Sequence, residues 1–258
     1  MPEITPLPEK TLNTVLEQNL HTEPTDNLAN ETTRLDPLAD GISSVQLVRV
    51  SGSDIDVVNA ARVSYGKFVQ ELSDRDAKLI AYLIKHHHTS PFEHNQLSFR
   101  IKCPLFVIRQ WMRHRMNSYN EISYRYVKAD LEFYVPRHWR YQDPKNKQGS
   151  LGSFENEALR QEYIKALDAT KHAYETLLEQ GVAREIARAI LPVCTYTEFI
   201  FTCNLHSLMH FLRLRLESNA QYEIRQFAQA LLKLALPHFP ASLGAWKELF
   251  MPELDLTF

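Results

Sequence analysis

The chain of 258 residues is 44% hydrophobic and 23% charged, the composition of a globular protein with one large domain. Its formal net charge of −2 excludes a general attraction to nucleic acid or anionic membranes, so any anion must be bound by a local cluster of bases. The sequence has no run of about eighteen apolar residues and no basic, apolar leader, which favours a cytoplasmic protein.

The three cysteines, Cys103, Cys194 and Cys203, lie in apolar stretches and form no C-x-x-C pair. Their odd number and their spacing argue against a disulfide framework and against a cysteine-based zinc site. We predict that they are reduced residues of the core, because free cysteine is among the most buried residue types.

Residues 1–43 are rich in Pro, Thr, Asn and Asp and have weak apolar periodicity. This composition predicts a polar N-terminal extension over 1–43, with one short helix around 11–20. A single folded domain is then expected over 44–258.

The domain is expected to begin with a strand over 45–50, which is rich in β-branched residues. Two helices follow, and each is preceded by a serine with an aspartate three residues later, the spacing of a capping box. The pairs are Ser53 with Asp56 and Ser73 with Asp76.

Apolar and polar side chains alternate over 94–103, which is the period of a half-buried strand. The apolar members are Leu97, Phe99, Ile101 and Cys103. Proline is tolerated in a first helical turn, so the segment 104–115 is predicted to be a helix.

The later elements expected in chain order are a strand over 129–136, a loop around 144–153, helices over 155–179 and 182–191, a strand over 195–203, and helices over 204–216 and 220–236. This mixture predicts an α/β (α+β) protein with a mixed sheet flanked by helices. Because the chain has seven glycines and no Gly-rich loop, phosphates would have to be bound by side chains.

The stretch RHRMNSYNEISYRY, residues 113–126, contains many hydrogen-bonding groups and almost nothing apolar. On the expected helix before it, Arg109 and Arg113 are four residues apart and share a face. In an extended chain, the period of two places a carboxylate, a hydroxyl and a guanidinium on one side: Glu121, Ser123 and Arg125. Such groups suit phosphate and sugar oxygens, so the run predicts an anion site. The alternative is a surface ladder of ion pairs, each worth little.

Two later helices carry further bases. Arg184 and Arg188 are one turn apart and can reach one side of that helix, but by themselves they are better explained as a surface pair with Glu185. In the helix over 204–216, the polar residues are Asn204 at the expected N-cap, His206 and His210 four apart, and Arg213 and Arg215 two apart, pointing in different directions. The apolar residues around them predict a largely buried helix, whose arginines need an internal carboxylate or a bound anion.

A metal site, and with it a zinc hydrolase, is an alternative suggested by four histidines: His86, His87, His88 and His94. However, no H-E-x-x-H occurs, and adjacent histidines at a helix end diverge by about 100° per residue. We therefore expect no metal. The histidines are either ordinary residues of a helix C-terminus, or His88 contributes to a ligand site at the turn that begins with Ser90.

The run RHRMNSYNEISYRY resembles the RHR-x7-S signature of the flavin-dependent thymidylate synthases, with residues 113–115 as RHR and Ser123 as the serine. Further segments resemble that family in the same order: 59–67, 88–94, 106–115, 181–192 and 204–228. The resemblance therefore covers the chain from Val45 to its end.

The resemblance implies an α/β fold particular to that family, a homotetramer, and active sites at subunit interfaces. It also implies the reaction: dUMP becomes dTMP, with carbon from methylene-tetrahydrofolate and electrons from FADH2, which NADPH regenerates. The partners it implies are these anionic small molecules, with no nucleic acid and no membrane. The rival from another class, a nucleic-acid-binding module with RHR and RYRY along a phosphate backbone, is disfavoured by the near-neutral charge and the scatter of the arginines.

Carried over to this sequence, the flavin site of the family comprises Ser90, Arg113, His114, Arg115, Glu121, Asn204, His206 and His210. Its dUMP site comprises Gln110, Arg113, Glu121, Ser123, Tyr124, Arg125, Arg188 and Arg215. His88 corresponds to a residue on the folate side, and Arg215 to the catalytic residue that stabilises negative charge developing on the pyrimidine. Two positions depart from the family: His206 stands where arginine is common, and Tyr124 where glycine is common.

None of the three cysteines lies among the clustered arginines, and Ser123 has no neighbouring general base, because Arg125 cannot act as one. We therefore predict no covalent bond between the protein and uracil. The reduced flavin would perform the redox step, and the protein would supply orientation and charge.

Overall fold

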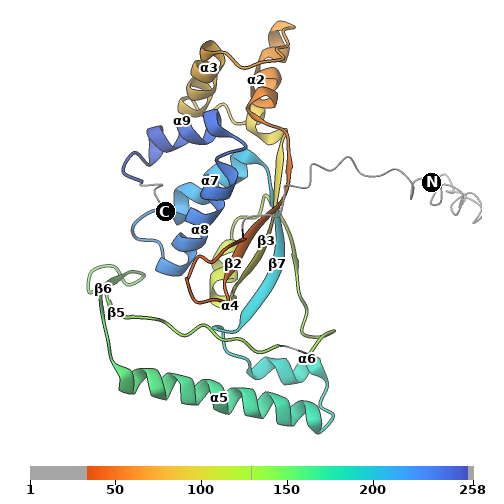
Figure 1. Ribbon diagram of the computed structural model, residues 1–258. Coiled ribbons are helices and arrows are strands. Elements are labelled where there is room, and N and C mark those ends of the chain that lie inside the picture. Colours follow the sequence, from red (N-terminus) through yellow and green to blue (C-terminus); the bar gives the residue numbers. More distant parts are fainter. Residues whose placement is uncertain (1–33, 129, 255–258) are drawn as a thin grey trace, which may run out of the picture. The chain divides into compact units, whose positions relative to one another are not determined.

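The computed structural model describes residues 34–128 and 130–254 (Figure 1). Within them the main sheet has five strands in the order β1-β2-β3-β7-β4, and all neighbours are antiparallel. The strands are β1 (Arg34–Leu35), β2 (Ser44–Ser51), β3 (Gln96–Pro104), β7 (Tyr196–Cys203) and β4 (Ser118–Glu121), and a separate pair consists of β5 (Trp139–Gln142) and β6 (Ser150–Phe154). The predicted combination of sheet and helices is confirmed, but the sheet is antiparallel rather than mixed.

The helices are α2 (Asp54–Arg62), α3 (Asp74–Lys85), α4 (Leu105–Trp111), α5 (Glu157–Glu179), α6 (Arg184–Ala187), α7 (Leu205–Arg215), α8 (Tyr222–Ala235) and α9 (Pro240–Phe250). Short 3-10 turns are η1 (Val63–Tyr65), η2 (Ser90–Glu93) and η3 (Arg188–Ile190). Helices α7, α8 and α9 lie together on one side of the sheet, whereas α5 and α6 lie together away from them (Figure 1). None of the helices described above is both long and apolar enough to cross a bilayer.

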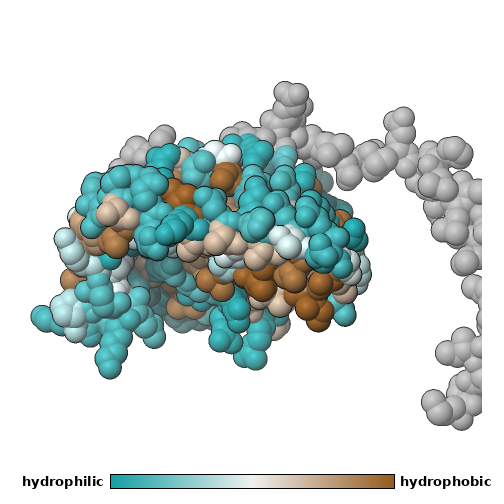
Figure 2. Space-filling model, turned by 90° about the horizontal axis from the view of Figure 1, so that it is seen from below, coloured by the Kyte–Doolittle hydropathy of each residue, from teal (hydrophilic) through white to brown (hydrophobic). Residues whose placement is uncertain are grey.

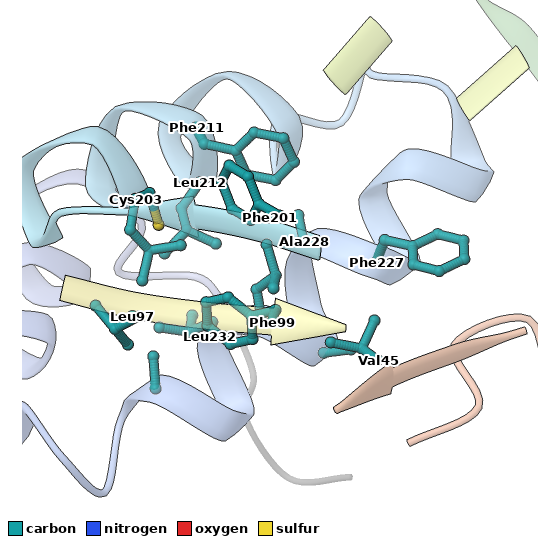
Figure 3. Packing of buried hydrophobic residues seen from close by; sticks show 14 of the residues in the cluster. Val45, Leu97, Phe99, Phe201, Cys203, Phe211, Leu212, Phe227, Ala228 and Leu232 are labelled. Carbon is teal, nitrogen blue, oxygen red and sulfur yellow. The ribbon is translucent and has the colours of Figure 1, made fainter. Parts of the chain in front are cut away.

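The predicted alternation in β3 determines which face of the sheet is buried. Leu97 pairs with Cys203, Phe99 with Phe201 and Ile101 with Phe199, and each of these side chains is at most 3% exposed. Side chains from α7 and α8 cover this face, among them Phe211, Leu212, Phe227, Ala228 and Leu232 (Figure 3). Burial of one such large apolar side chain stabilises the fold by roughly 1.5–3 kcal/mol. All three cysteines are free and buried, as predicted.

Both predicted capping boxes are present. At α2 the Ser53 side chain accepts from the backbone N–H of Asp56, and the Asp56 side chain accepts from the backbone N–H of Ser53. Ser73 and Asp76 form the same pair of bonds at α3. Each box satisfies N–H groups that a helix start leaves without partners.

A buried carboxylate joins α2 to α9. Asp54, 2% exposed, accepts hydrogen bonds from the backbone N–H of Ala241 at 2.7 Å, and from the N–H and hydroxyl of Ser242 at 3.0 and 2.5 Å. The two N–H groups belong to the first turn of α9, so this single side chain caps that helix from a distance.

The extension predicted over 1–43 is too long. Arg34 and Leu35 pair with β2, and Leu38 is buried in the core. Asp40 then accepts from the backbone N–H of Ser43, which closes the turn into β2. The polar composition concealed an edge strand whose stability comes from pairing rather than from its own sequence. The helix predicted around 11–20 lies outside the described residues.

Other differences lie in the middle and at the end of the chain. The strand predicted over 129–136 is reduced to one bridge, between Phe133 and Thr195. The loop predicted around 144–153 contributes to the β5–β6 hairpin, and α9 was not predicted. The start of α9 is held by a long-range contact, the hydrogen bonds that its first N–H groups donate to Asp54.

Candidate active site

The RHR motif starts two residues after α4 ends. The helix predicted over 104–115 stops at Trp111, a fully buried side chain. Its neighbours are aromatic, with ring centroids 4.8–6.0 Å away: Phe199, Phe201, Phe211 and Phe227. The Tyr119 hydroxyl donates to the carbonyl oxygens of Trp111 at 3.2 Å and His114 at 2.8 Å, acceptors that a continuing helix would have used itself. Arg113, His114 and Arg115 are therefore presented on a tight turn, not on a helical face.

Arg215, the last residue of α7, is hydrogen-bonded from two sides. Its Nε donates to Nε2 of His114 at 3.1 Å, and its guanidinium donates to the main-chain oxygen of Gln110 at 3.1 Å. His114 is 7% exposed, and its pKa is lowered from 6.5 to about 4 by burial and then by the charges of Arg215 and His210. The imidazole is thus neutral at ordinary pH and can accept this bond. Burial also lowers the pKa of Arg215.

Arg215 lies on the wall of an open cavity of about 810 Å³, which we call the arginine cavity. Its lining residues are Arg109, Gln110, Arg113, Asn146, Gln148, Leu214, Arg215, Asn219, Ala220 and Gln221. None of these described lining residues is acidic, so three guanidinium groups face the cavity without a carboxylate among them. Such a surface attracts an anion.

A second cavity, of about 160 Å³, lies between the histidine tract and helices α7 and α9; we call it the histidine cavity. Its polar lining comprises His87, His88, Thr89, His206, His210 and Arg213, and its apolar lining Leu83, Ile84, Phe92, Met209, Trp246 and Phe250. The Arg213 guanidinium lies 4.7 Å from the Phe250 ring centroid, which confirms that Arg213 and Arg215 point in different directions. Among the residues that the structure describes, no group of three or more His, Cys, Asp or Glu is arranged for a metal ion.

The two cavities adjoin through His114. Its ring centroid lies 5.6 Å from that of His210, which lines the histidine cavity, and it bonds to Arg215, which lines the arginine cavity. Residues near 114, 210 and 215 thus form a continuous wall.

A third group of expected site residues lies apart from both cavities. The extended run expected through 126 ends at Glu121, and the N–H groups of Tyr126 and Val127 bond back to the carbonyl oxygen of Ser123. The chain therefore turns just after Ile122, whose N–H still bonds to the carbonyl oxygen of Glu198 in β7. The Tyr124 hydroxyl donates to the Tyr196 carbonyl oxygen at 2.7 Å, so its side chain anchors the turn rather than facing a ligand.

The structure thus sorts the expected residues into groups. Gln110, Arg113 and Arg215 line the arginine cavity, and His88, His206 and His210 line the histidine cavity. The other expected residues line neither: Ser90, Arg115, Glu121, Asn204, Ser123, Tyr124, Arg125 and Arg188, with His114 between the two. Of these, Arg188 is exposed and directly follows α6 in the chain. Helix α6 lies away from α7 (Figure 1).

Residues 46–241 match the family model described as thymidylate synthase complementing protein. A flavin-dependent thymidylate synthase of Thermus thermophilus is 47% identical over 204 residues, which cover 79% of this chain and 75% of that protein. The chain belongs to the flavin-dependent thymidylate synthase family. The predicted membership of that family is thereby confirmed.

Two further comparisons agree with this family assignment. The flavin-dependent thymidylate synthase of Wolbachia pipientis is 43% identical over 209 residues, covering 79% of this chain and 73% of that protein. A solved structure of the UMP/dUMP methylase PolB from Streptomyces cacaoi, bound with 5-Br dUMP, has a TM-score of 0.74 and 36% identity, and covers 80% of this chain and 95% of that chain. Family membership makes the chain an enzyme, rather than a nucleic-acid-binding module or a zinc hydrolase.

Several lining residues were not predicted as site residues. Trp246 and Phe250 come from α9, and Asn146 and Gln148 from the β5–β6 loop. A signal for α9 was present, since Pro240 suits a first helical turn and Leu243, Trp246 and Phe250 recur at helical spacing. No local pattern assigns Asn146 or Gln148, because their role depends on where the hairpin packs.

Neutral His114 should make the stability of this synthase fall in acid. Because the pKa of His114 is about 4 when folded and near 6.5 when unfolded, its contribution is complete above pH 6.5 and is lost as the pH falls to 4. The loss amounts to at most about 3 kcal/mol. In thermal unfolding of the flavin-free protein, His114→Asn should flatten the decline between pH 7 and 4.5, whereas the exposed control His172→Asn should not. Equal slopes for all three proteins would contradict this assignment.

Proposed function

We propose that this chain converts dUMP to dTMP, taking carbon from methylene-tetrahydrofolate and electrons from FADH2, with NADPH as the reductant that regenerates the flavin. The observation that carries the proposal is the fixed guanidinium of Arg215 on the wall of a cavity with two further arginines and no acidic lining residue. The bases suit the phosphate of a nucleotide, and family membership supplies the reaction class.

The histidine cavity fits part of a flavin by the chemistry of its donors. Imidazoles and the Arg213 guanidinium can bond to phosphate and ring oxygens, and the Trp246 and Phe250 rings can pack against a flat aromatic system. We infer that His88, His206 and His210 bind FAD or the folate beside it, with Ser90 and Asn204 close by in sequence. When bound and reduced, FAD supplies the two electrons of the reductive methylation. The loss of arginine at position 206 is offset by Arg213 in the same cavity.

We assign to Arg215 the role of stabilising negative charge that develops on the pyrimidine. Its guanidinium is fixed by two acceptors, neutral His114 and the Gln110 carbonyl oxygen, before any substrate arrives. A donor that is already oriented requires no reorganisation during the reaction, which is the condition for effective electrostatic catalysis.

We also propose a homotetramer in which a second copy completes the site. Glu121, Ser123, Arg125 and Arg188 line neither cavity of their own chain, so they are available to meet a nucleotide bound by another copy. Large apolar side chains between α2 and α3 are highly exposed: Val63 72%, Tyr65 81% and Phe68 79%. Apolar patches also interrupt the mainly hydrophilic surface seen in Figure 2. Exposed apolar clusters of this kind favour burial against a partner.

The absence of an enzyme nucleophile is part of the proposal. The thiols of Cys103, Cys194 and Cys203 are buried and burial raises their pKa, the opposite of what a reactive thiolate needs. The Ser123 hydroxyl meets the N–H and Nε donors of Arg125 at 3.4 Å and has no described base beside it. Three reduced cysteines also suit the cytoplasmic location that we propose.

The direct test is product formation. Purified protein should be yellow or become so with FAD, and should lose flavin absorbance on addition of NADPH. With dUMP and methylene-tetrahydrofolate it should then form dTMP, and omission of any one component should prevent product formation. Flavin binding without dTMP, or dTMP formed without flavin, would overturn the proposed function.

A further inference from the structure

A buried hydroxyl on β7 holds the carboxylate that ends β4. The Thr197 hydroxyl donates to Oε1 of Glu121 at 2.6 Å, and Thr197 itself is only 2% exposed. Glu121 is the last residue of β4 and is exposed, although its side chain is anchored at this point. The family resemblance places Glu121 in both the flavin site and the dUMP site, whereas Thr197 has no assigned role.

The register of the sheet explains why these two side chains meet. Glu121 lies opposite Phe199 across the antiparallel pair of β4 and β7, so both side chains project from the same face of the sheet. Thr197 is the second residue before Phe199 along β7 and projects from that face as well. It is thus a diagonal neighbour of Glu121, at a separation that a long side chain can span.

The surroundings of this carboxylate leave it able to bind a further donor. Within residues 34–128 and 130–254, Glu121 forms no ion pair with a lysine, arginine or histidine, and Thr197 is the one side chain that hydrogen-bonds to it. A carboxylate accepts several hydrogen bonds and donates none, so Oε2 is available as an acceptor. A carboxylate without a cation repels phosphate and suits a neutral donor such as a sugar hydroxyl.

We propose that Thr197 is a positioning residue, which holds Glu121 so that its second carboxylate oxygen accepts a hydrogen bond from a sugar hydroxyl of a bound ligand. The inference rests on the proposed function, which supplies two such ligands. The deoxyribose of dUMP has a 3′-hydroxyl, and FAD has hydroxyls on its ribityl chain and its ribose. Without the bond from Thr197, the exposed Glu121 side chain would sample several rotamers, and binding would have to select one of them.

The Thr197→Val substitution removes the hydroxyl and keeps the shape of the side chain in its buried position. Because Glu121 is exposed, water can replace the lost donor, and the fold should be retained. In calorimetric titration of the flavin-saturated, full-length protein, the dissociation constant of dUMP should rise about tenfold. Turnover at saturating dUMP should stay near the wild-type rate, because a sugar contact does not touch the reacting atoms. Thr197→Ser keeps the hydroxyl and should restore wild-type affinity.

Two further titrations identify which sugar donates. The dideoxy analogue of dUMP lacks the 3′-hydroxyl, so wild-type protein and Thr197→Val should bind this analogue equally well if dUMP is the donor. If the flavin is the donor, titration of flavin-free protein with FAD should show the loss instead, and dUMP affinity should be unchanged. Unchanged affinity for both ligands would overturn the proposal, as would equal weakening of dUMP and its dideoxy analogue in the flavin-saturated protein.

A matched control and a double variant separate this role from a general effect on β7. Thr202 lies on the opposite face of the same strand, where its hydroxyl and that of Ser98 bond at 2.9 Å, and Thr202→Val should leave both affinities unchanged. If Thr197 acts only through Glu121, then Thr197→Val combined with Glu121→Ala should bind no more weakly than Glu121→Ala alone. Additive losses of affinity would contradict the proposal.

The same series covers a folding failure and a failure of the proposed function. If Thr197→Val does not fold, Thr197→Ala, which needs less space in the buried position, must show the same weakening. Wild-type protein that binds neither dUMP nor FAD would instead refute the proposed function.

Discussion

Replacement of Arg215 by methionine is expected to abolish dTMP formation while leaving flavin bound. The side chain touches neither the apolar wall nor the histidines of the histidine cavity, so flavin absorbance should persist in the purified variant. Its guanidinium is the fixed charge nearest to His114 and Gln110, and loss of a comparable preorganised donor lowers kcat by roughly a hundredfold to a thousandfold. The measurement is single-turnover dTMP formation at saturating dUMP.

The matched control for that variant is Arg75→Met. Arg75 is an exposed arginine on α3, outside both cavities, and its replacement should leave turnover unchanged. Wild-type turnover in Arg215→Met, or loss of flavin together with activity, would remove Arg215 from its assigned role.

Replacement of Asp54 by alanine is expected to give the largest loss of stability. Two N–H groups and one hydroxyl of α9 would lose their acceptor in a buried position. We expect the free energy of unfolding to fall by about 3 kcal/mol. For a domain of this size that corresponds to a decrease in Tm of about 6–12 °C. Because Trp246 and Phe250 of α9 line the histidine cavity, flavin affinity should weaken as well.

Asp56→Ala is the control on the same helix. Asp56 is exposed and belongs only to the capping box with Ser53, so its loss should destabilise by about 1 kcal/mol and leave flavin affinity intact. Calorimetric unfolding measures the loss of stability in both variants, and flavin titration measures the loss of flavin affinity. Equal effects of the two substitutions would contradict a special role for Asp54 in seating α9.

Local sequence rules predicted the parts of the fold that short-range physics determines. The alternation of Leu97, Phe99 and Ile101 predicted the buried face of β3, and the Ser-Asp pairs predicted where α2 and α3 begin. The divergence of Arg213 and Arg215 also followed from helical geometry alone. These features need only neighbours within a few residues, which the sequence displays directly.

Features set by distant contacts could not be predicted in this way. Where α4 ends, the Tyr119 hydroxyl donates to the carbonyl oxygens of Trp111 and His114, and a pattern of apolar residues contains no such information. His114 and Arg215 are joined by a hydrogen bond across 101 positions of sequence. The family resemblance supplied the roles of Gln110 and Arg215. Neither the resemblance nor periodicity indicated the hydrogen bonds that connect Gln110 through Gln221 to the buried Glu223.

The pairing of β3 with β7 has a consequence for synthesis of the chain. Pro104 lies opposite Tyr196, so the two strands at the middle of the sheet cannot meet until β4, the hairpin, α5 and α6 have all been made. Closing so long a segment costs conformational entropy before any contact compensates for it. A nascent chain on the ribosome therefore exposes the apolar face and open edge of β3 from the synthesis of β3 until β7 emerges, and chaperones that bind extended apolar segments would find their target there.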